Sequence, residues 1–278
     1  MSFHLTLAPA GGALDTAGFE ALFDGRVNYE VGDGQAAYQN RDTGIYFLFD
    51  HEDGAVRFSI NTRRSAIFAE EAAEELEAVF GEGFVDETGA PFSVEGFREA
   101  WRAANTEAVA ALLAEGATPL ALPLRTNLAM WRWNRALPRS QAELGDGTIA
   151  PPLLFFADPD GNPRPTYVWL VTMAMAKPPP AEAVLIADEV TPRLRDRLRG
   201  QAPQPDTVGV LEIRRLRDLG FPAWRAGEHL VFHIPRGQRH PGMLATLAAA
   251  ESYAKPVGAA IPIDQVLDRE TVDAARAA

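Results

Sequence analysis

The chain has 278 residues, 47% of them hydrophobic, and 38 acidic residues against 26 basic ones give it a net charge of −12. A chain of this length and apolar content can bury two cores, which excludes a wholly disordered protein. It contains no cysteine, and this excludes disulfides, thiolate zinc sites, iron–sulfur clusters and cysteine nucleophiles.

The first residues show neither a basic leader nor an apolar segment of the length that a signal peptide needs. The most apolar later run, residues 167–176, is about half of the ~20 residues that a membrane span requires. The sequence therefore predicts a cytoplasmic protein with no membrane partner.

The charge is unevenly placed along the chain. Residues 1–117 hold 21 acidic residues and 7 arginines, a net charge of −14, whereas the remainder holds 17 acidic and 19 basic residues, a net charge of +2. This imbalance argues against nucleic acid as the main partner and leaves open a basic protein partner for the first half. An acidic surface that only confers solubility is the alternative interpretation.

Residues 3–7 alternate between apolar and polar and predict a first strand. Asp15 can cap a following helix, in which Phe19, Leu22 and Phe23 recur at helical spacing. Further strands are expected over residues 27–31 and 35–39. The first half thus predicts the order β-α-β-β-β-β, a meander of strands with a helix laid across it.

A β-hairpin at residues 43–61 is the clearest structural prediction. Asp53 and Gly54 suit a two-residue turn because both positions need a positive φ. In that register Phe49 faces Phe58 and Phe47 faces Ile60 on one side of the sheet. On the other side Asp50 faces Arg57, its expected partner, Leu48 faces Ser59, and Tyr46 faces Asn61.

Residues 69–80 predict an acidic helix that ends at Gly81, and its glutamates, Glu70, Glu71, Glu74, Glu75 and Glu77, are expected on its solvent side. Ser93 should cap the next helix. Residues 124–135 predict another helix, preceded by a proline-rich linker. We therefore expect an acidic α+β domain at residues 1–117, a helical connection at 118–150 and a second α+β domain at 151–278.

The second half shows strand patterns at residues 153–156, 167–175, 183–187, 208–213 and 228–234, and helical patterns after Pro192 and over residues 241–253 and 264–276. The predicted fold class is α+β with two domains, each a mainly antiparallel sheet with helices packed on it.

No motif of a known reaction is present: the chain has no G-x-S-x-G, no P-loop and no G-x-G-x-x-G. His229 and His233 fall on a predicted strand, where residues four apart lie ~13 Å from each other, too far to share a metal ion. The sequence predicts no cofactor, no metal and no catalytic residue, although a triad assembled from distant residues stays open.

Two tryptophans and an arginine are candidates for binding. On a helix Trp131 and Trp133 point to different sides, so at most one of them packs inward with Leu128. We expect the other, with Arg135, to contact the other domain or a partner protein.

Residues 38–47, the pattern Y-x-N-x-D-T-G-x-Y-F, resemble a segment of uncharacterised bacterial proteins of similar size. The resemblance implies a cytoplasmic bacterial protein with two α+β parts, and it brings no assigned reaction. We take Tyr38, Asn40, Asp42 and Tyr46 as candidate binding residues, although Asn40, Asp42 and Gly44 also suit a turn.

The leading functional hypothesis is a non-catalytic protein-interaction module, either a toxin-neutralising (immunity-like) protein or an accessory factor. One alternative is a hydrolase or transferase of small substrates with its site between the two halves. Another is a structural subunit whose tryptophan is buried in an oligomer.

Overall fold

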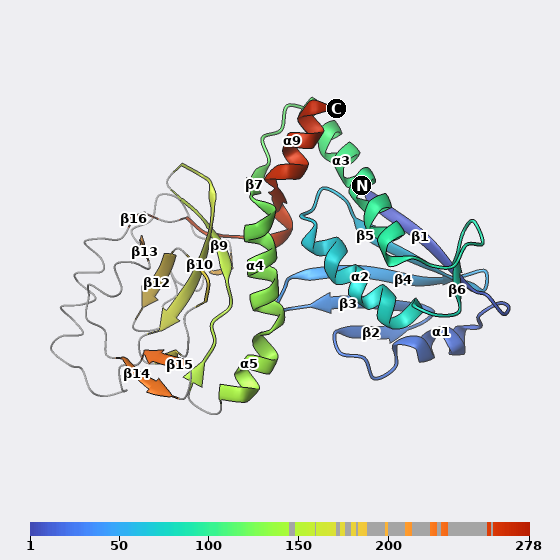
Figure 1. Ribbon diagram of the computed structural model, residues 1–278, viewed down its shortest axis with the longest axis horizontal. Helices are drawn as coiled ribbons and strands as arrows, with labels where there is room; N and C mark the ends of the chain where they lie inside the picture. Colours follow the sequence, from blue (N-terminus) through green and yellow to red (C-terminus); the bar gives the residue numbers. More distant parts are fainter. Residues whose placement is uncertain are drawn as a thin grey trace. The chain divides into compact units, whose positions relative to one another are not determined.

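A computed structural model describes residues 1–144, 148–158, 160–170, 173–175, 179–181, 183–187, 198–199, 209–212, 223–226, 229–232, 255–256 and 258–278. The chain forms two compact units: Met1–Asn127 with Asp264–Ala278, and Leu128–Ile263. Both hold strands and most of the sheet pairing is antiparallel, with helices besides, so the predicted α+β class is confirmed (Figure 1).

The first unit is built on a six-stranded sheet with the order β2-β3-β4-β5-β1-β6, in which every neighbouring pair is antiparallel. Its strands are β1 (Ser2–Pro9), β2 (Tyr29–Gly32), β3 (Gln35–Asn40), β4 (Ile45–Glu52), β5 (Ala55–Asn61) and β6 (Phe84–Asp86). With α1 (Thr16–Phe23) after β1, the observed order begins β-α-β-β-β-β, as the sequence predicts.

The predicted hairpin is present in the predicted register. Phe49 pairs with Phe58, Asp50 with Arg57 and Leu48 with Ser59, and the turn has φ of 51° at Asp53 and 78° at Gly54. Only the expected ion pair differs, because Arg57 bonds Glu52 while Asp50 accepts from Gln35.

The helices cover one side of this sheet, which we call the helix face. Alternation along the strands places Tyr38, Phe47, Phe49, Phe58 and Ile60 on it, all buried. Phe23 of α1 and Phe80 of α2 (Ile67–Phe80) contact Phe49, and Phe97 of α3 (Val94–Ala114) contacts Phe58. Asp15 and Ser93 cap α1 and α3 through their side chains, as predicted.

The expectation for Glu71 is wrong. The glutamate-rich stretch of α2 was expected to face solvent, but Glu71 is fully buried. It shares the inner side of α2 with Ile67, one turn earlier, and polar groups from β3 and the β3–β4 turn surround its carboxylate. A run of charged residues indicates a solvent-facing surface only when no facing element offers polar partners that can bind one of the charges.

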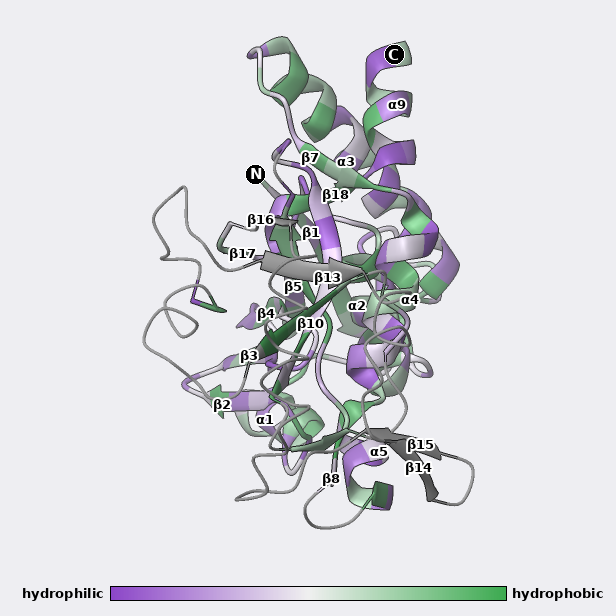
Figure 2. Cartoon of the chain, turned by 90° about the vertical axis from the view of Figure 1, so that its left-hand side faces the viewer, coloured by the Kyte–Doolittle hydropathy of each residue, from purple (hydrophilic) through white to green (hydrophobic). Residues whose placement is uncertain are grey.

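The last residues of the chain complete the first unit, although the sequence pattern groups them with the second half. Strand β18 (Val266–Asp268) pairs in parallel with β7 (Leu120–Leu122), within the segment predicted as a linker. Helix α9 (Arg269–Ala277) is amphipathic (Figure 2) and buries Val272 and Ala275 in a cluster with Val109 of α3.

The buried Asp268 carboxylate fixes this segment. It accepts from the Ser65 hydroxyl and the Ala66 backbone N–H, each at 2.6 Å, and from the Asn127 amide at 2.8 Å. Asp268 thereby binds a backbone donor at the N-terminus of α2, which lacks a capping side chain of its own.

The second unit contains two described sheets. One has the order β16-β13-β12-β10-β9-β17 and the other β14-β15-β11-β8; β10–β12 and β11–β8 are parallel and the remaining pairs antiparallel. The strands are β8 (Thr148–Ile149), β9 (Leu154–Ala157), β10 (Pro163–Leu170), β11 (Ala174–Met175), β12 (Ala183–Ala187), β13 (Gly209–Glu212), β14 (Ala223–Ala226), β15 (His229–Phe232), β16 (Lys255–Pro256) and β17 (Ala260–Ile261).

Three further helical segments are described: α4 (Leu124–Arg135), α5 (Leu137–Leu144) and the 3₁₀ turn η1 (Ile263–Gln265). The helix predicted over residues 241–253, the helix start at Pro192 and His233 lie outside the described residues. Among the described residues, none of the helices combines the length and the hydropathy that a bilayer span requires.

Candidate functional site

The side of the first sheet opposite the helix face carries the candidate site, and we call it the open face. Alternation along three neighbouring strands places the site's side chains there: Ala37 and Gln39 from β3, Tyr46 and Leu48 from β4, and Ser59 and Asn61 from β5. Tyr46 is 37% exposed, and it is among the most exposed large hydrophobic side chains of the described residues.

A hollow of about 460 Å³ lies on the open face. Its lining includes the open-face residues Ala37, Gln39, Tyr46, Leu48, Ser59 and Asn61, together with Ser2 of β1. The short side chains of Ala37 and Ser59 lie on either side of Leu48, and the longer side chains of Gln39 and Tyr46 lie opposite each other, two residues along the strands. The volume falls in the range of small-molecule pockets, about 300–1,000 Å³.

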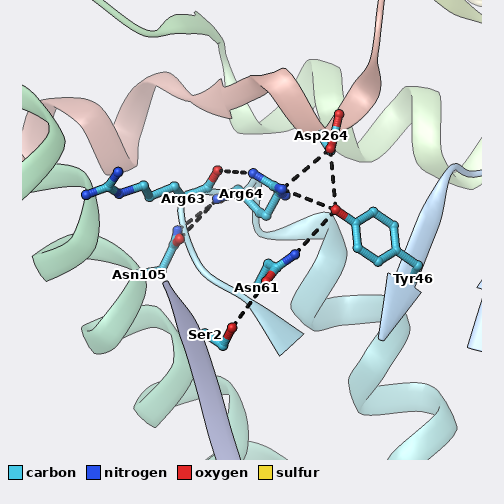
Figure 3. Close-up of polar contacts among 7 residues, drawn as sticks. All are labelled: Ser2, Tyr46, Asn61, Arg63, Arg64, Asn105 and Asp264. Carbon is cyan, nitrogen blue, oxygen red and sulfur yellow. Dashed lines mark hydrogen bonds and ion pairs between the residues drawn. The ribbon is translucent and has the colours of Figure 1, made fainter. Parts of the chain in front are cut away.

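The Tyr46 hydroxyl is fixed at the rim of this hollow by three polar groups (Figure 3). It accepts from the Asn61 amide at 3.3 Å and from the Arg64 guanidinium at 3.2 Å, and it donates to Asp264 at 3.5 Å. Its ring also meets Phe68 of α2 edge-on, with the centroids 6.1 Å apart. The tyrosine is therefore held in one orientation before any ligand arrives.

Arg64 reaches Tyr46 because the β5–α2 connection turns sharply before it. Arg63 adopts a φ of 60°, and its guanidinium bonds the Ala108 carbonyl oxygen on α3, away from Tyr46. The buried Asn105 side chain accepts from the Arg64 backbone N–H at 3.1 Å and donates to its carbonyl oxygen at 2.9 Å. These two hydrogen bonds fix the Arg64 backbone and thereby set the direction of its side chain (Figure 3).

Asp264 ties the C-terminal segment to the same cluster. Its carboxylate lies 3.4 Å from the Arg64 guanidinium, and both side chains are only partly exposed. The ion pair neutralises Arg64, so that the Tyr46 end of the hollow presents hydrogen-bonding groups and an aromatic ring rather than a net charge.

The predicted binding segment 38–47 is divided between the two faces. Tyr38 and Asn40 are buried and donate to the same Glu71 oxygen, at 2.6 Å and 2.7 Å, with the Thr43 hydroxyl at 3.1 Å. Asp42 lies exposed in the β3–β4 turn. Of the four predicted residues of this segment, only Tyr46 belongs to the open face.

The predicted residues of α4 lie apart from this cluster in the sequence and are described within the second unit. Trp131 is buried, 5.9 Å from the Arg135 guanidinium, and Trp133 is half-buried and donates to the Pro151 carbonyl oxygen at 2.9 Å. Trp131 and Trp133 thus differ in burial, as the helical spacing predicts.

One end of the first sheet gathers acidic loops. The β2–β3 turn carries Asp33, Glu52 ends β4, the β4–β5 turn carries Asp53, and Asp15 caps α1. Backbone bonds from His51 to Gly34 and from Leu14 to Gly54, both 2.8 Å, hold the three loops together. At this end Arg57 forms an ion pair with Glu52 at 3.3 Å.

The open face combines hydrogen-bonding side chains with one exposed aromatic ring. Hydroxyl and amide groups can both donate and accept hydrogen bonds, and the Tyr46 ring offers apolar surface with a fixed polar tip. No group of three or more His, Asp or Glu side chains in the described ranges is placed to hold a metal ion.

Sequence reasoning missed Arg64, Asn105 and Asp264. The predicted register already placed Asn61 beside Tyr46, so the hairpin did indicate one partner. Asp264 comes from a segment more than 200 residues away, and no local pattern points from one to the other.

Comparison with known proteins gives no further assignment: no family model matches the chain, and neither the curated proteins nor the solved structures contain a match to it.

Proposed function

We propose that this protein is a non-catalytic protein-interaction module whose first unit binds a basic partner protein through the open face. A toxin-neutralising protein or an accessory factor of a bacterial cytoplasmic system fits this description. We further propose that the two compact units are separate domains and that the second carries no part of this binding surface.

The observation that carries the proposal is Tyr46, an exposed aromatic side chain held at the edge of a hollow by Asn61, Arg64 and Asp264. Tyrosine and arginine are enriched among the residues that dominate protein–protein binding energy. A side chain that is ordered beforehand loses little conformational entropy on binding. The hollow beside it is large enough to accept a partner's side chain.

The net charge of the first unit indicates the sign of the charge expected on the partner. Met1–Asn127 with Asp264–Ala278 contain 25 acidic and 10 basic residues, a net charge of −15, while the rest of the chain has 13 and 16, a net charge of +3. A field of this sign speeds encounter with a basic protein and repels acidic ones.

The proposal is tested by capturing the native partner on the tagged full chain, identifying it, and measuring its affinity for purified variants. Tyr46→Ala should weaken binding about 10-fold or more, because truncation of a central aromatic anchor typically costs at least about 1–2 kcal/mol. Tyr46→Phe, which keeps the ring, should weaken it less.

Glu107→Gln on α3 is the matched control, because this exposed residue lies on a helix of the other face and should leave the affinity unchanged. Raising the salt concentration should weaken binding of the wild-type protein, since opposite charges attract less when screened. A partner whose affinity ignores both Tyr46→Ala and salt would refute the proposal.

A further inference from the structure

Strand β2 forms one edge of the first sheet, and beyond it the described residues contribute no further strand. Its pairing with β3 runs from Tyr29 opposite Tyr38 to Gly32 opposite Gln35. An edge strand presents backbone N–H and C=O groups that can pair with another chain.

The register shows which backbone groups are available. The Gln39 backbone N–H donates to the Asn28 carbonyl oxygen at 2.9 Å, and hydrogen-bonded pairs alternate along an antiparallel ladder. The backbone N–H and C=O groups of Glu30 and Gly32 therefore point toward β3, whereas those of Tyr29 and Val31 point away from the sheet.

Exposed apolar side chains accompany this edge. Val27 is 81% and Val31 39% exposed, which places them among the five most exposed large hydrophobic side chains of the described residues. The edge itself is firmly anchored, because the Tyr29 hydroxyl donates to Glu75 of α2 at 3.2 Å and its ring packs on Phe23. A docked segment would meet a rigid template with apolar surface beside it.

The charges around the edge are acidic. Asp24, Glu30 and Asp33 are exposed there, and the nearby Arg26 is half-buried with its guanidinium bonded to the carbonyl oxygens of Leu22 and Ala78. Edge charges of one sign discourage pairing with a second copy of the same strand. They leave the edge open to a strand of opposite charge.

We propose that β2 binds an extended, basic segment of the partner protein by strand addition, with apolar residues beside Val31 and basic residues beside Glu30. This inference rests on the proposed function, since it assumes a basic partner for the first unit. It also extends the same surface: Glu30 lies opposite Ala37, so an added strand continues the open face next to the hollow.

The test uses the full chain and a labelled peptide, Lys-Val-Lys-Val-Lys-Val-Lys, as the probe. We place the peptide antiparallel to β2, where residues directly opposite each other share a face and alternate pairs exchange both of their backbone hydrogen bonds. With valines opposite Tyr29 and Val31, the valine nitrogens face β2 and the lysine nitrogens face solvent. A peptide methylated on its valine nitrogens should therefore bind at least 10-fold more weakly, and one methylated on its lysine nitrogens should bind like the parent.

The matching protein variants are Val31→Pro and Val31→Thr. Proline removes the outward N–H without breaking a bond to β3 and should weaken peptide binding about 10-fold. Threonine keeps that N–H and the preference for a strand, and should weaken it only about 2- to 3-fold. Unchanged thermal unfolding of Val31→Pro confirms that the sheet is intact, and amide shifts in residues 27–34 on adding the parent peptide locate the site.

Absence of peptide binding would overturn the strand-addition proposal. Equal affinity of the two methylated peptides, or of Val31→Pro and the wild-type protein, would overturn it as well, since binding would then depend on charge alone. The proposed function is judged separately with the native partner. If Val31→Pro keeps the partner and Tyr46→Ala loses it, the edge proposal fails while the open-face proposal stands.

Discussion

The two faces of the first sheet use tyrosine in opposite ways. On the helix face Tyr38 is buried and donates to Glu71, so its hydroxyl helps to join β3 to α2. On the open face Tyr46, eight residues later in the same segment, is fixed by Asn61, Arg64 and Asp264 yet keeps 37% of its surface exposed. One continuous segment thus supplies both a structural contact and a candidate binding group.

The cluster around Glu71 and the cluster around Tyr46 should respond differently when one hydrogen-bonding side chain is removed. Around Glu71 water cannot replace a missing partner, so a deletion leaves buried donors unsatisfied. Around Tyr46 water can replace a lost bond, so a deletion should affect binding more than folding. This contrast leads to predictions of decreasing size.

The largest effect is expected for Glu71→Leu. The hydroxyls of Tyr38 and Thr43 and the amide of Asn40 would lose their common acceptor inside the protein. We expect the free energy of unfolding to fall by about 3–5 kcal/mol, as when one partner of a buried polar network is removed. Urea denaturation measures this directly.

Two further variants sharpen that measurement. Glu71→Gln keeps an oxygen acceptor and should cost less than Glu71→Leu. Glu99→Gln on α3 is exposed and should stay within about 0.5 kcal/mol of the wild-type protein. A loss under about 1 kcal/mol for Glu71→Leu would contradict a structural role for the buried half of the segment.

A second buried carboxylate, that of Asp268, should make the stability of the fold depend on pH. Burial raises the pKa of Asp268 above its ordinary value of 3.8, and the nearby Glu270 acts in the same direction, against hydrogen bonds from Ser65, Ala66 and Asn127. At pH values between the pKa of Asp268 in the unfolded chain and its raised pKa in the folded protein, the folded protein binds more protons than the unfolded chain. Its stability therefore falls as pH rises through that window.

Asp268→Asn should reveal this dependence of stability on pH, because asparagine does not titrate. The variant should be less stable by about 1–3 kcal/mol at pH 4, since its amide donates where the carboxyl group accepts. The difference from the wild-type protein should shrink as the pH rises toward neutrality. Urea denaturation at several pH values measures it, and a difference that grows with pH would show that the hydrogen bonds outweigh burial.

For Tyr46 the expected effect on folding is smaller. Tyr46→Phe removes three hydrogen bonds whose remaining partners can turn to water, and should cost about 0.5–1 kcal/mol. Thermal unfolding of the purified variant checks this. A loss as large as that of Glu71→Leu would mean that the open-face cluster is also a structural contact, and the reason to regard Tyr46 as a binding group would weaken.

The sequence predicts the local parts of this arrangement and misses the distant ones. Asp53 and Gly54 fix the hairpin register by themselves, so the faces of Phe49 and Tyr46 follow from alternation alone. Glu71 was misplaced because a charge run carries no sign of the three donors on β3 and the β3–β4 turn. The hollow depends on the small size of Ala37 and Ser59 relative to their neighbours, which becomes informative only once they are side by side.

The C-terminal segment shows a further limit. Parallel pairing of β18 with β7 joins strands more than 140 residues apart, and neither strand is longer than three residues. Such short strands lack the alternation that marks an antiparallel hairpin, and the connection between them is far longer than a turn. Asp264 therefore reaches Arg64 through topology that local patterns do not encode.

The smallest effect is expected for Arg57→Gln on the open face. The side chains of Arg57 and Glu52 are 40% and 52% exposed and lie 3.3 Å apart, an arrangement in which water screens the attraction. The free energy of unfolding should change by less than about 0.5 kcal/mol, and a double-mutant cycle with Glu52→Gln should give a coupling that vanishes in about 0.5 M salt. A coupling above about 1 kcal/mol that persists in salt would place part of the fold's stability on the open face. The two faces would then differ in degree rather than in role, because even a pair open to water would be holding the sheet together.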